Sequence, residues 1–425
     1  MKFLISSILA FFLISCGTLS QKPDFAWILP GADFDRQDYP ISIELPGEIE
    51  SDKGNPVLVE IVDGKQVQVP SQISYGEELE LSWIVEGISK AGQERQYELR
   101  FDKGKAEISE IKVEKNDTTL FLTRGDQPIL HYCYKEMPAP AGQSYLFARS
   151  GFIHPLYSPS GEVLTWAQPP DHLHHVGLWN PWTKVTWKDN HTDFWNLAAG
   201  LGTVRFRDVL TTENGLVYAE FCVLHDHIAF VPPKPPKEED EYSGDEVIVM
   251  EEEWIIRVWD MEDGYLLDFT SLIRNVLDES ISLDAYRYGG GLGYRATSKW
   301  NKDNSIVLTS EGKTRENGDA TRAKWAWISG DLEGKATGLL FMSDPDNYDF
   351  PQPMRIWPDN SNGVGHQYFE FTPIREKAWI LEPGQTYSQK YRIWVQEGDV
   401  IPEKAEQQWQ QYVKAMDQKI SYLSN

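Results

Sequence analysis

The chain has 425 residues, of which 65 are Asp or Glu and 40 are Lys or Arg, so its formal net charge at pH 7 is −25. This balance argues against nucleic acid as a partner and disfavours binding to anionic membrane surfaces, because both need basic surfaces that displace counterions. A hydrophobic fraction of 41%, with 16 Trp, 19 Tyr and 18 Phe, is typical of a folded globular protein and, at this length, of about two domains.

The first residues resemble a targeting signal. Lys2 precedes an apolar run over residues 3–14, which is shorter than the roughly 20 residues that span a bilayer. A lipoprotein signal is indicated by Leu13-Ile14-Ser15-Cys16-Gly17, where small residues flank a cysteine. We therefore expect residues 1–15 to be removed and Cys16 to carry lipid, which would anchor the protein in the cell envelope, periplasmic or surface-exposed, with no other membrane contact. A plain secretory signal with an incidental cysteine is the alternative.

A tether over residues 16–37 is expected to lead into a first domain. Residues 38–104 alternate apolar and polar side chains with a period of two, as in Ile41-Ser42-Ile43-Glu44-Leu45, and Gly/Asp turns such as residues 63–65 separate the runs. This pattern predicts half-buried strands joined by tight turns. We assign residues 38–104 to a small N-terminal β-sandwich.

The same alternation continues over residues 110–398, for example at 119–123, 254–259 and 391–395. The apolar runs are short and rich in β-branched and aromatic residues, which predicts a large antiparallel β-sandwich. A proline-rich stretch at 231–237 is interpreted as a surface insertion. In the tail, residues 399–425, Ala405, Trp409, Tyr412 and Ala415 have helical spacing and predict a C-terminal helix packed on the sandwich. The predicted fold class is all-β.

Histidines give the strongest chemical signal. Four of the nine lie between positions 154 and 175, namely His154, His172, His174 and His175. The two prolines before Asp171 are expected to keep the backbone extended. In an extended chain, alternation would point His172 and His174 to one face and Asp171 and His175 to the other.

Two imidazoles on one face suit either of two kinds of chemistry. His172 and His174 could transfer protons, with Asp171 orienting one ring and His154 and His175 as further catalytic candidates. Alternatively, His172, His174 and His154 could hold a divalent metal such as zinc. Hydrogen bonding that merely ties loops together is the structural alternative for each of them.

Tryptophans crowd the segment that follows. Trp179, Trp182, Trp187 and Trp195 fall within seventeen residues, with Asn180 among them. Flat aromatic faces beside amides suit the apolar faces and hydroxyl edges of a sugar ring, although tryptophan is also a common core residue. We expect some of these rings to line a cleft and the others to lie in the core.

Several motifs together resemble one known family. The runs "SGFIHPLYSPSGEVLT", "PPDHLHHVGLW" and "TDFWN" between residues 149 and 196, and the segments 289–295, 353–358 and 379–384, are similar to the DUF6807 family over roughly residues 115–397. Many relatives have Arg where this chain has Val176, so an anion contact made there is expected to be absent. The closing strands also resemble the supersandwich of galactose-mutarotase-like proteins.

Members of that family often carry the label "methane oxygenase PmoA", which we reject. The subunit of that name is a polytopic membrane protein, and no segment after residue 14 has 18 uninterrupted apolar residues. The resemblance therefore implies a fold more than an activity.

We expect a carbohydrate-active envelope protein, a hydrolase, lyase or epimerase with a His-rich cleft. A non-catalytic carbohydrate-binding protein is the alternative, and a metal-dependent oxidoreductase is the third. Second carboxylates could come from Glu252, Glu253, Glu370 or Glu382. The side chains expected to bind substrate are Trp179, Asn180, Trp182, Trp195, Tyr294, Arg295, Arg355 and Trp357.

Overall fold

The structure is a computed structural model that describes residues 22–47, 53–76, 78–104, 111–237, 242–399, 401–416 and 420–423. The expected signal peptide and Cys16 lie outside these residues. Within them, no helix is long and apolar enough to cross a bilayer.

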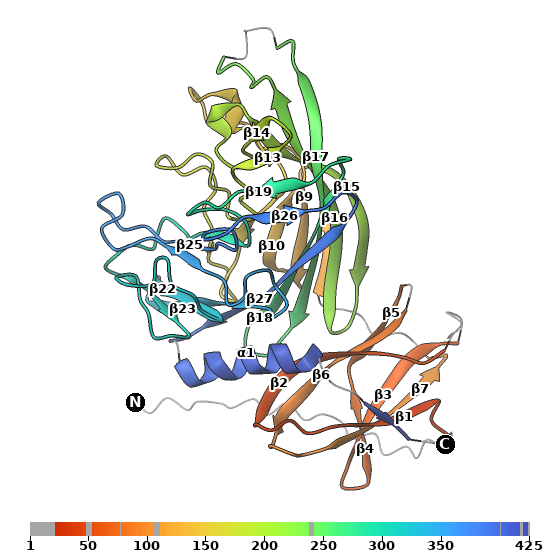
Figure 1. The fold of residues 1–425 in the computed structure, drawn as a ribbon. Helices are drawn as coiled ribbons and strands as arrows, with labels where there is room; N and C mark the ends of the chain where they lie inside the picture. Colours follow the sequence, from red (N-terminus) through yellow and green to blue (C-terminus); the bar gives the residue numbers. More distant parts are fainter. Residues whose placement is uncertain are drawn as a thin grey trace.

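A small sandwich of two antiparallel sheets forms one end of the molecule (Figure 1). Trp27, Trp83 and Tyr97 fill its core. The ring centroids of the two tryptophans lie 5.7 Å apart, and those of Trp83 and Tyr97 lie 5.1 Å apart. Its strands are β1 (Phe25–Leu29), β2 (Arg36–Glu44), β3 (Asn55–Val62), β4 (Lys65–Val69), β5 (Ser71–Tyr75), β6 (Leu79–Ser89), β7 (Arg95–Asp102) and β28 (Ser421–Tyr422). The sheet orders are β28-β1-β7-β3-β4 and β2-β6-β5.

Both ends of the chain build this sandwich, which differs from the boundaries we expected. The range 16–37 was expected to be a tether, but it contains β1, whose Trp27 is fully buried. β28 adds to the other edge of β1, with Trp27 opposite Tyr422. A short apolar run such as residues 25–29 forms a strand here because both neighbouring strands cover its backbone hydrogen-bonding groups.

The large unit follows as two eight-stranded sheets and one four-stranded sheet, and every strand pair is antiparallel. The first sheet has the order β24-β25-β20-β12-β11-β10-β9-β8. Its strands are β8 (Ile111–Lys115), β9 (Thr119–Arg124), β10 (Gln127–Cys133), β11 (Phe152–Leu156), β12 (Leu178–Trp179), β20 (Gly293–Arg295), β24 (Met354–Ile356) and β25 (Tyr368–Phe371).

The second eight-stranded sheet has the order β15-β16-β17-β18-β27-β23-β22-β21, and the four-stranded sheet has the order β14-β13-β19-β26. The strands of the second sheet are β15 (Gly202–Asn214), β16 (Tyr218–Val231), β17 (Asp245–Asp260), β18 (Tyr265–Asn275), β21 (Ser305–Thr309), β22 (Trp325–Leu332), β23 (Lys335–Ser343) and β27 (Thr386–Glu397). The small sheet contains β13 (Val185–Trp187), β14 (Asn190–Thr192), β19 (Ile281–Leu283) and β26 (Trp379–Leu381).

The main core lies between the two large sheets and follows the period-two alternation. On β25, Phe369 and Phe371 point into this core, whereas Tyr368 and Glu370 point to the opposite face of the sheet. The chain is therefore an all-β protein whose first large sheet has one apolar face and one face with polar side chains.

The helix α1 (Pro402–Met416) joins the two units (Figure 1). Gln411 exchanges hydrogen bonds with the Gln37 backbone of the small sandwich, at 2.7 and 3.2 Å. On the large unit, Trp409 donates to the Ser343 carbonyl at 3.0 Å. The predicted C-terminal helix thus packs on both sandwiches.

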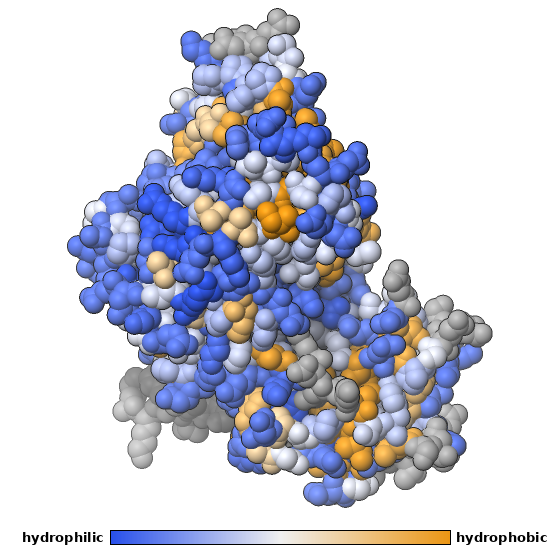
Figure 2. Space-filling view, in the orientation of Figure 1, coloured by the Kyte–Doolittle hydropathy of each residue, from blue (hydrophilic) through white to orange (hydrophobic). Residues whose placement is uncertain are grey.

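The surface in view is mostly hydrophilic over the large unit, whereas apolar patches gather on the small sandwich (Figure 2). Its exposed apolar side chains include Val62, Val67 and Ile88. The large unit also exposes single apolar side chains, such as Leu210 and Ile306.

Candidate functional site

Two consecutive β-turns shape the segment that carries three of the clustered histidines. The His172 amide donates to the Pro169 carbonyl at 2.9 Å, and the His175 amide donates to the His172 carbonyl at 3.0 Å. Pro170 occupies the second position of the first turn, where its fixed φ is favoured. The expected extended conformation of this segment is therefore wrong, because the proline pair starts a turn. We call residues 169–175 the histidine turn.

The turns bring the three imidazoles into one group, the imidazole cluster of His172, His174 and His175. Their ring centroids lie 5.5 Å (172 to 174), 4.8 Å (172 to 175) and 4.7 Å (174 to 175) apart. The His172 side chain is 30% exposed, His174 is half-buried and His175 is buried. Exposure to solvent therefore decreases from His172 to His175. The three rings lie together, whereas the expected extended chain would place them on two faces of a strand.

Four large aromatic rings, which we call the aromatic floor, pack under this cluster. His175 lies 4.7 Å from Tyr368, 5.3 Å from Trp179 and 5.7 Å from Trp195, measured between centroids. Trp357 completes the floor, 4.7 Å from His172. Three of these rings are among the expected substrate-binding residues, and the structure brings them together with the imidazoles.

Strand alternation decides which residues reach this floor. Gly293, Tyr294 and Arg295 form β20, and Arg295 lies opposite Tyr368 on the neighbouring strand. Arg295 therefore shares a sheet face with Tyr368, whereas Tyr294 points into the core, where its hydroxyl donates to the Leu164 carbonyl at 2.7 Å. The expectation that Tyr294 binds substrate is not supported by this placement, because it is fully buried on the opposite face.

A buried guanidinium fixes the start of the histidine turn. Arg295 donates from Nη2 to both carboxylate oxygens of Asp171, at 2.9 and 2.7 Å, and Asn362 adds a third donor at 3.0 Å. The Arg295 guanidinium also lies 4.7 Å from the Trp357 ring and 5.3 Å from the Trp166 ring. Asp171 is held in place by this contact, and its carboxylate is largely satisfied before any ligand binds.

The imidazoles of this cluster are neutral at physiological pH. Burial lowers the pKa of His174 to about 4, and it holds the pKa of His175 well below its ordinary value. Burial also lowers the pKa of His172, although the Asp171 carboxylate opposes this effect. A neutral imidazole offers one donor and one acceptor nitrogen, so each ring can accept a proton.

The imidazole nitrogens are not tied to the backbone. The buried Nδ1 atoms of His172 and His175 have no hydrogen-bond partner among the described residues. His172 Nδ1 lies 3.4 Å from an Asp171 oxygen, which is long for a hydrogen bond. Buried polar atoms are normally satisfied in native proteins, so the nitrogen of the partly exposed His172 is suited to a polar ligand.

His154 is not part of the cluster. Its Nδ1 is 2.9 Å from the Thr165 hydroxyl, and burial, together with the nearby His131, lowers its pKa to about 4. No ring contact joins His154 to the other three histidines within the described residues. No described group of three or more His, Cys, Asp or Glu side chains is arranged to hold a metal ion. The expected His154, His172 and His174 metal shell is therefore not formed.

Two further expected binding residues lie away from the floor. Trp182 is fully buried and packs against Trp379 in a second core, with 6.0 Å between centroids. Asn180 is buried and donates its amide to Glu252, which also accepts from His227 at 2.7 Å. Although burial favours the neutral acid, the bond and charge of His227 hold the pKa of Glu252 at about 2. This network is an interior group of hydrogen-bonded side chains.

The four candidate second carboxylates have different surroundings. Glu252 lies in that interior group, Glu253 is on the opposite face of β17, and Glu382 is exposed and accepts from Ser280. Glu370 is fully buried beside the aromatic floor and accepts from the Tyr368 hydroxyl at 2.5 Å and from the Gly289 amide at 2.7 Å. Burial raises the pKa of Glu370 to about 8, so it is mainly protonated at neutral pH.

Sequence reasoning missed three residues of the site. Tyr368 forms part of the floor, Asn362 binds Asp171, and Tyr288 contacts Trp195 at 5.4 Å between centroids. The alternation Tyr368-Phe369-Glu370-Phe371 was a signal for the first, since it places two polar residues on one face. Nothing local marks the other two, which reach the site from distant loops.

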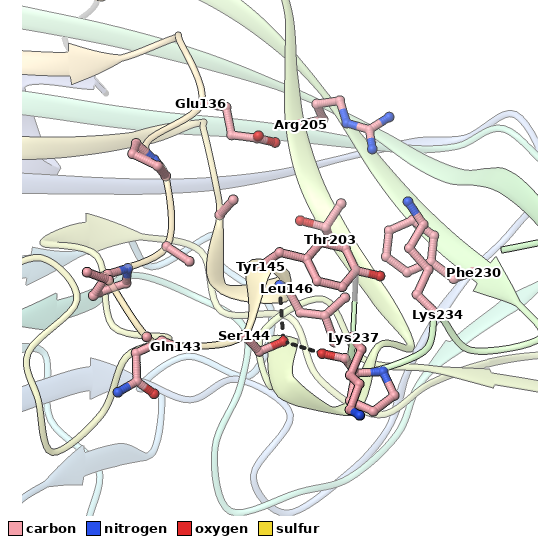
Figure 3. Close-up of a pocket in the computed structure, with 17 residues that line it drawn as sticks. Glu136, Gln143, Ser144, Tyr145, Leu146, Thr203, Arg205, Phe230, Lys234 and Lys237 are labelled. Atoms are coloured by element: carbon pink, nitrogen blue, oxygen red, sulfur yellow. Dashed lines mark hydrogen bonds between the residues drawn. The ribbon is translucent and has the colours of Figure 1, made fainter. Parts of the chain in front are cut away.

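A separate cavity of about 790 Å³ lies between residues 136–148 and the end of the second large sheet (Figure 3). The proline-rich stretch closes one side, where Ser144 donates to the Pro236 carbonyl at 3.1 Å and Tyr145 donates to Pro235 at 3.0 Å. Lys234 lies over Phe230 at 4.2 Å in the same wall. None of the three clustered histidines lines this cavity. The imidazole cluster and this cavity are thus separate features of the molecule.

Fold and site together define an all-β sandwich protein with a histidine and tryptophan site on the outer face of its first large sheet. The sequence profile described as "Family of unknown function (DUF6807)" matches residues 119–410, and the chain belongs to this family. The match covers the large unit except β8, together with part of α1, and it excludes strands β1 to β7 and β28 of the small sandwich.

No curated protein matches the chain. Among solved structures it is similar to an alpha-mannosidase from Enterococcus faecalis V583, with 10% sequence identity and a TM-score of 0.49. That similarity covers 94% of this chain and 46% of the mannosidase chain. It is also similar to a galactose mutarotase related enzyme from Lactobacillus acidophilus, at 11% identity, 67% of this chain, 97% of that chain and a TM-score of 0.33. The chain spans less than half of the mannosidase.

Proposed function

We propose that this protein acts on carbohydrate and moves a proton at the imidazole cluster, as a lyase or an epimerase does. One observation carries the proposal: three neutral imidazoles, from the partly exposed His172 to the buried His175, lie on an aromatic floor, and the Nδ1 atoms of His172 and His175 have no hydrogen-bond partner among the described residues.

Aromatic rings at both ends of the cluster support a sugar as the ligand. Trp166 and Tyr288 are both half-buried. Trp166 contacts the Arg295 guanidinium beside the floor, and Tyr288 contacts the Trp195 ring of the floor. Sugar rings pack their C–H faces on such surfaces while their hydroxyls bond to neighbouring polar groups. His172, with 30% of its side chain exposed, supplies a polar edge beside the Trp357 ring of the floor.

Neutral imidazoles favour proton transfer. A general base must be unprotonated at the working pH and within reach of the proton that it takes. His174 satisfies the first condition down to about pH 4, and its ring lies 5.5 Å from the more exposed His172. One imidazole can therefore take a proton from the sugar as a general base and, as the imidazolium so formed, return that same proton to the substrate or leaving group.

Hydrolysis is less well supported. Glycoside hydrolases generally use two carboxyl groups that face each other across the scissile bond. Here Asp171 is engaged by Arg295 and Asn362, and Glu370 is sealed beneath Tyr368. Proton abstraction from a sugar carbon, followed by elimination or by return of the proton, needs only the imidazoles.

The test is incubation of the purified protein with plant, algal and host glycans, followed by mass spectrometry of the products. We expect product from at least one glycan, and loss of about 100-fold or more of that activity in the His172→Ala/His174→Ala variant, which lacks both proton carriers. His191→Ala is the matched control, because His191 is exposed on β14 and outside the cluster.

Unchanged turnover in the double variant would contradict the proposal. Sugar binding without any product, in the native protein as well as in the variant, would instead identify a non-catalytic carbohydrate-binding protein.

A further inference from the structure

An expected ion pair beside the aromatic floor is not made. Arg355 on β24 lies directly opposite Glu370 on β25, so the two side chains share a sheet face. Opposite charges at such positions normally pair. Both Glu370 oxygens are instead bonded to the Tyr368 hydroxyl and the Gly289 amide. The Arg355 guanidinium is therefore left to other partners.

Those partners hold Arg355 at the edge of the site. Its Nη1 lies 2.7 Å from Asp319, and its Nη2 donates to the Tyr288 hydroxyl at 3.1 Å. Because Tyr288 uses its oxygen to accept this bond, its O–H proton stays available as a donor. The Arg355 side chain is 17% exposed, and its Nε has no partner among the described residues.

The edge of the site around Arg355 and Tyr288, which we call the arginine corner, carries more positive than negative charge, although the protein as a whole is strongly acidic. Asp319 also accepts from Arg375 at 3.3 Å, so two guanidinium groups share one carboxylate. Arg287 lies over the Tyr288 ring at 4.9 Å and forms no ion pair within the described residues. Glu376, which follows Arg375 in the chain, pairs with Arg322 instead.

The arginine corner is continuous with the imidazole cluster. The Tyr288 ring lies 5.4 Å from Trp195, and Trp195 lies 5.4 Å from His174. Trp195 is itself buried, whereas His174 and Tyr288 are half-buried. A sugar that contacts His174 and the Tyr288 ring would therefore place one substituent near Arg355 and the Tyr288 hydroxyl.

We infer that the sugar bound at this site carries a carboxylate, and that Arg355 and the Tyr288 hydroxyl bind it. The inference rests on the proposed function and specifies its substrate class as an acidic sugar, such as a uronic acid. A planar carboxylate matches the donor geometry of a guanidinium, and partial burial strengthens the charge-assisted bonds.

The experiment compares acid and amide forms of the same sugar by isothermal titration calorimetry. The probes are D-glucuronate and D-glucuronamide, D-galacturonate and D-galacturonamide, with glucose, galactose and glucose 6-sulfate as further arms. We expect one acid to bind about tenfold or more tightly than its amide, the size of one charge-assisted hydrogen bond, and more tightly than the sulfate.

Arg355→Gln should abolish the preference for the acid over its amide. Arg207→Gln is the matched control: it removes an exposed arginine paired with Asp226 and Glu251 on the second sheet, and should keep the preference. Tyr288→Phe, which removes only the hydroxyl, should weaken the preference and serves if Arg355→Gln does not fold.

Equal affinity for acid and amide in both series, or a preference that survives in folded Arg355→Gln, would overturn the inference. If neutral sugars still bind and depend on His172 and His174, the proposed function stands without it. If no sugar binds, both fail.

Discussion

Glu370 shows how a single residue can organise the site without touching a ligand. Its two oxygens fix the Tyr368 ring beneath His175 and the Gly289 amide beside Tyr288. The groups that act on its carboxyl are the Tyr368 hydroxyl, the Gly289 amide and the more distant charges of Arg355 and Arg375. Burial outweighs these charges and keeps the carboxyl protonated.

This protonation predicts a pH-dependent stability. The pKa of Glu370 is about 8 in the folded state against an ordinary 4.5, so folding retains a proton that the unfolded chain releases. Its contribution is fully present below pH 4.5 and is lost as the pH rises towards 8. Glu370→Gln keeps the shape without the charge. We expect the melting temperature of this variant, relative to that of the native protein, to increase as the pH rises from 5 to 8.

Thermal unfolding of both proteins at pH 5, 6.5 and 8 measures this effect. A constant difference between them across that range would mean that Glu370 is ionised in the folded protein.

At the scale of elements, α1 and β28 hold the small sandwich to the rest of the molecule. Gln407 and Gln411 bond to the backbone of residues 35–37, Trp409 and Glu406 bind the large unit, and β28 covers the free edge of β1. The matched residues 119–410 end inside this helix. The two units are therefore coupled by a segment that lies at the far end of the chain from the small sandwich.

Truncation after residue 398 tests this coupling. We expect the small sandwich to unfold in a separate, earlier calorimetric transition, because the edge of β1 and the cover over β2 are lost together. Truncation after residue 416 is the control, since it keeps α1 and removes only β28, and its effect should be smaller. A single unchanged transition after the longer truncation would show that the direct contacts between Gln72 and Glu213 suffice.

Sequence patterns predicted the strands well and the site only in part. Period-two patterns and short runs of β-branched and aromatic residues located β2, β3, β9 and β27. The sequence pattern predicts an extended chain at the histidine turn, because two consecutive prolines fit an extended chain as well as a turn. Tyr288 and Arg355 are 67 positions apart, and β28 pairs with β1 across almost the whole chain. Such contacts depend on the tertiary fold, which no local pattern encodes.

At the scale of the whole molecule, we propose that the protein is tethered to the cell envelope through Cys16, which lies outside the described residues. The acidic, hydrophilic surface offers anionic lipid no attraction, so a lipid chain would be the only attachment. Cys16→Ala should move the protein from the membrane fraction to the soluble fraction and remove metabolically incorporated palmitate. Continued membrane association of that variant would refute the tether.

The most direct test of proton transfer at the imidazole cluster is hydrogen exchange at a sugar carbon, followed by proton NMR in D₂O. We expect the native protein to replace one carbon-bound hydrogen of its sugar with deuterium, and the His172→Ala/His174→Ala variant to leave that hydrogen in place. Because burial keeps the pKa of His174 near 4, exchange should persist well below pH 6.5. A sugar that binds with no exchange, or exchange that continues in the double variant, would contradict a proton-transferring imidazole cluster.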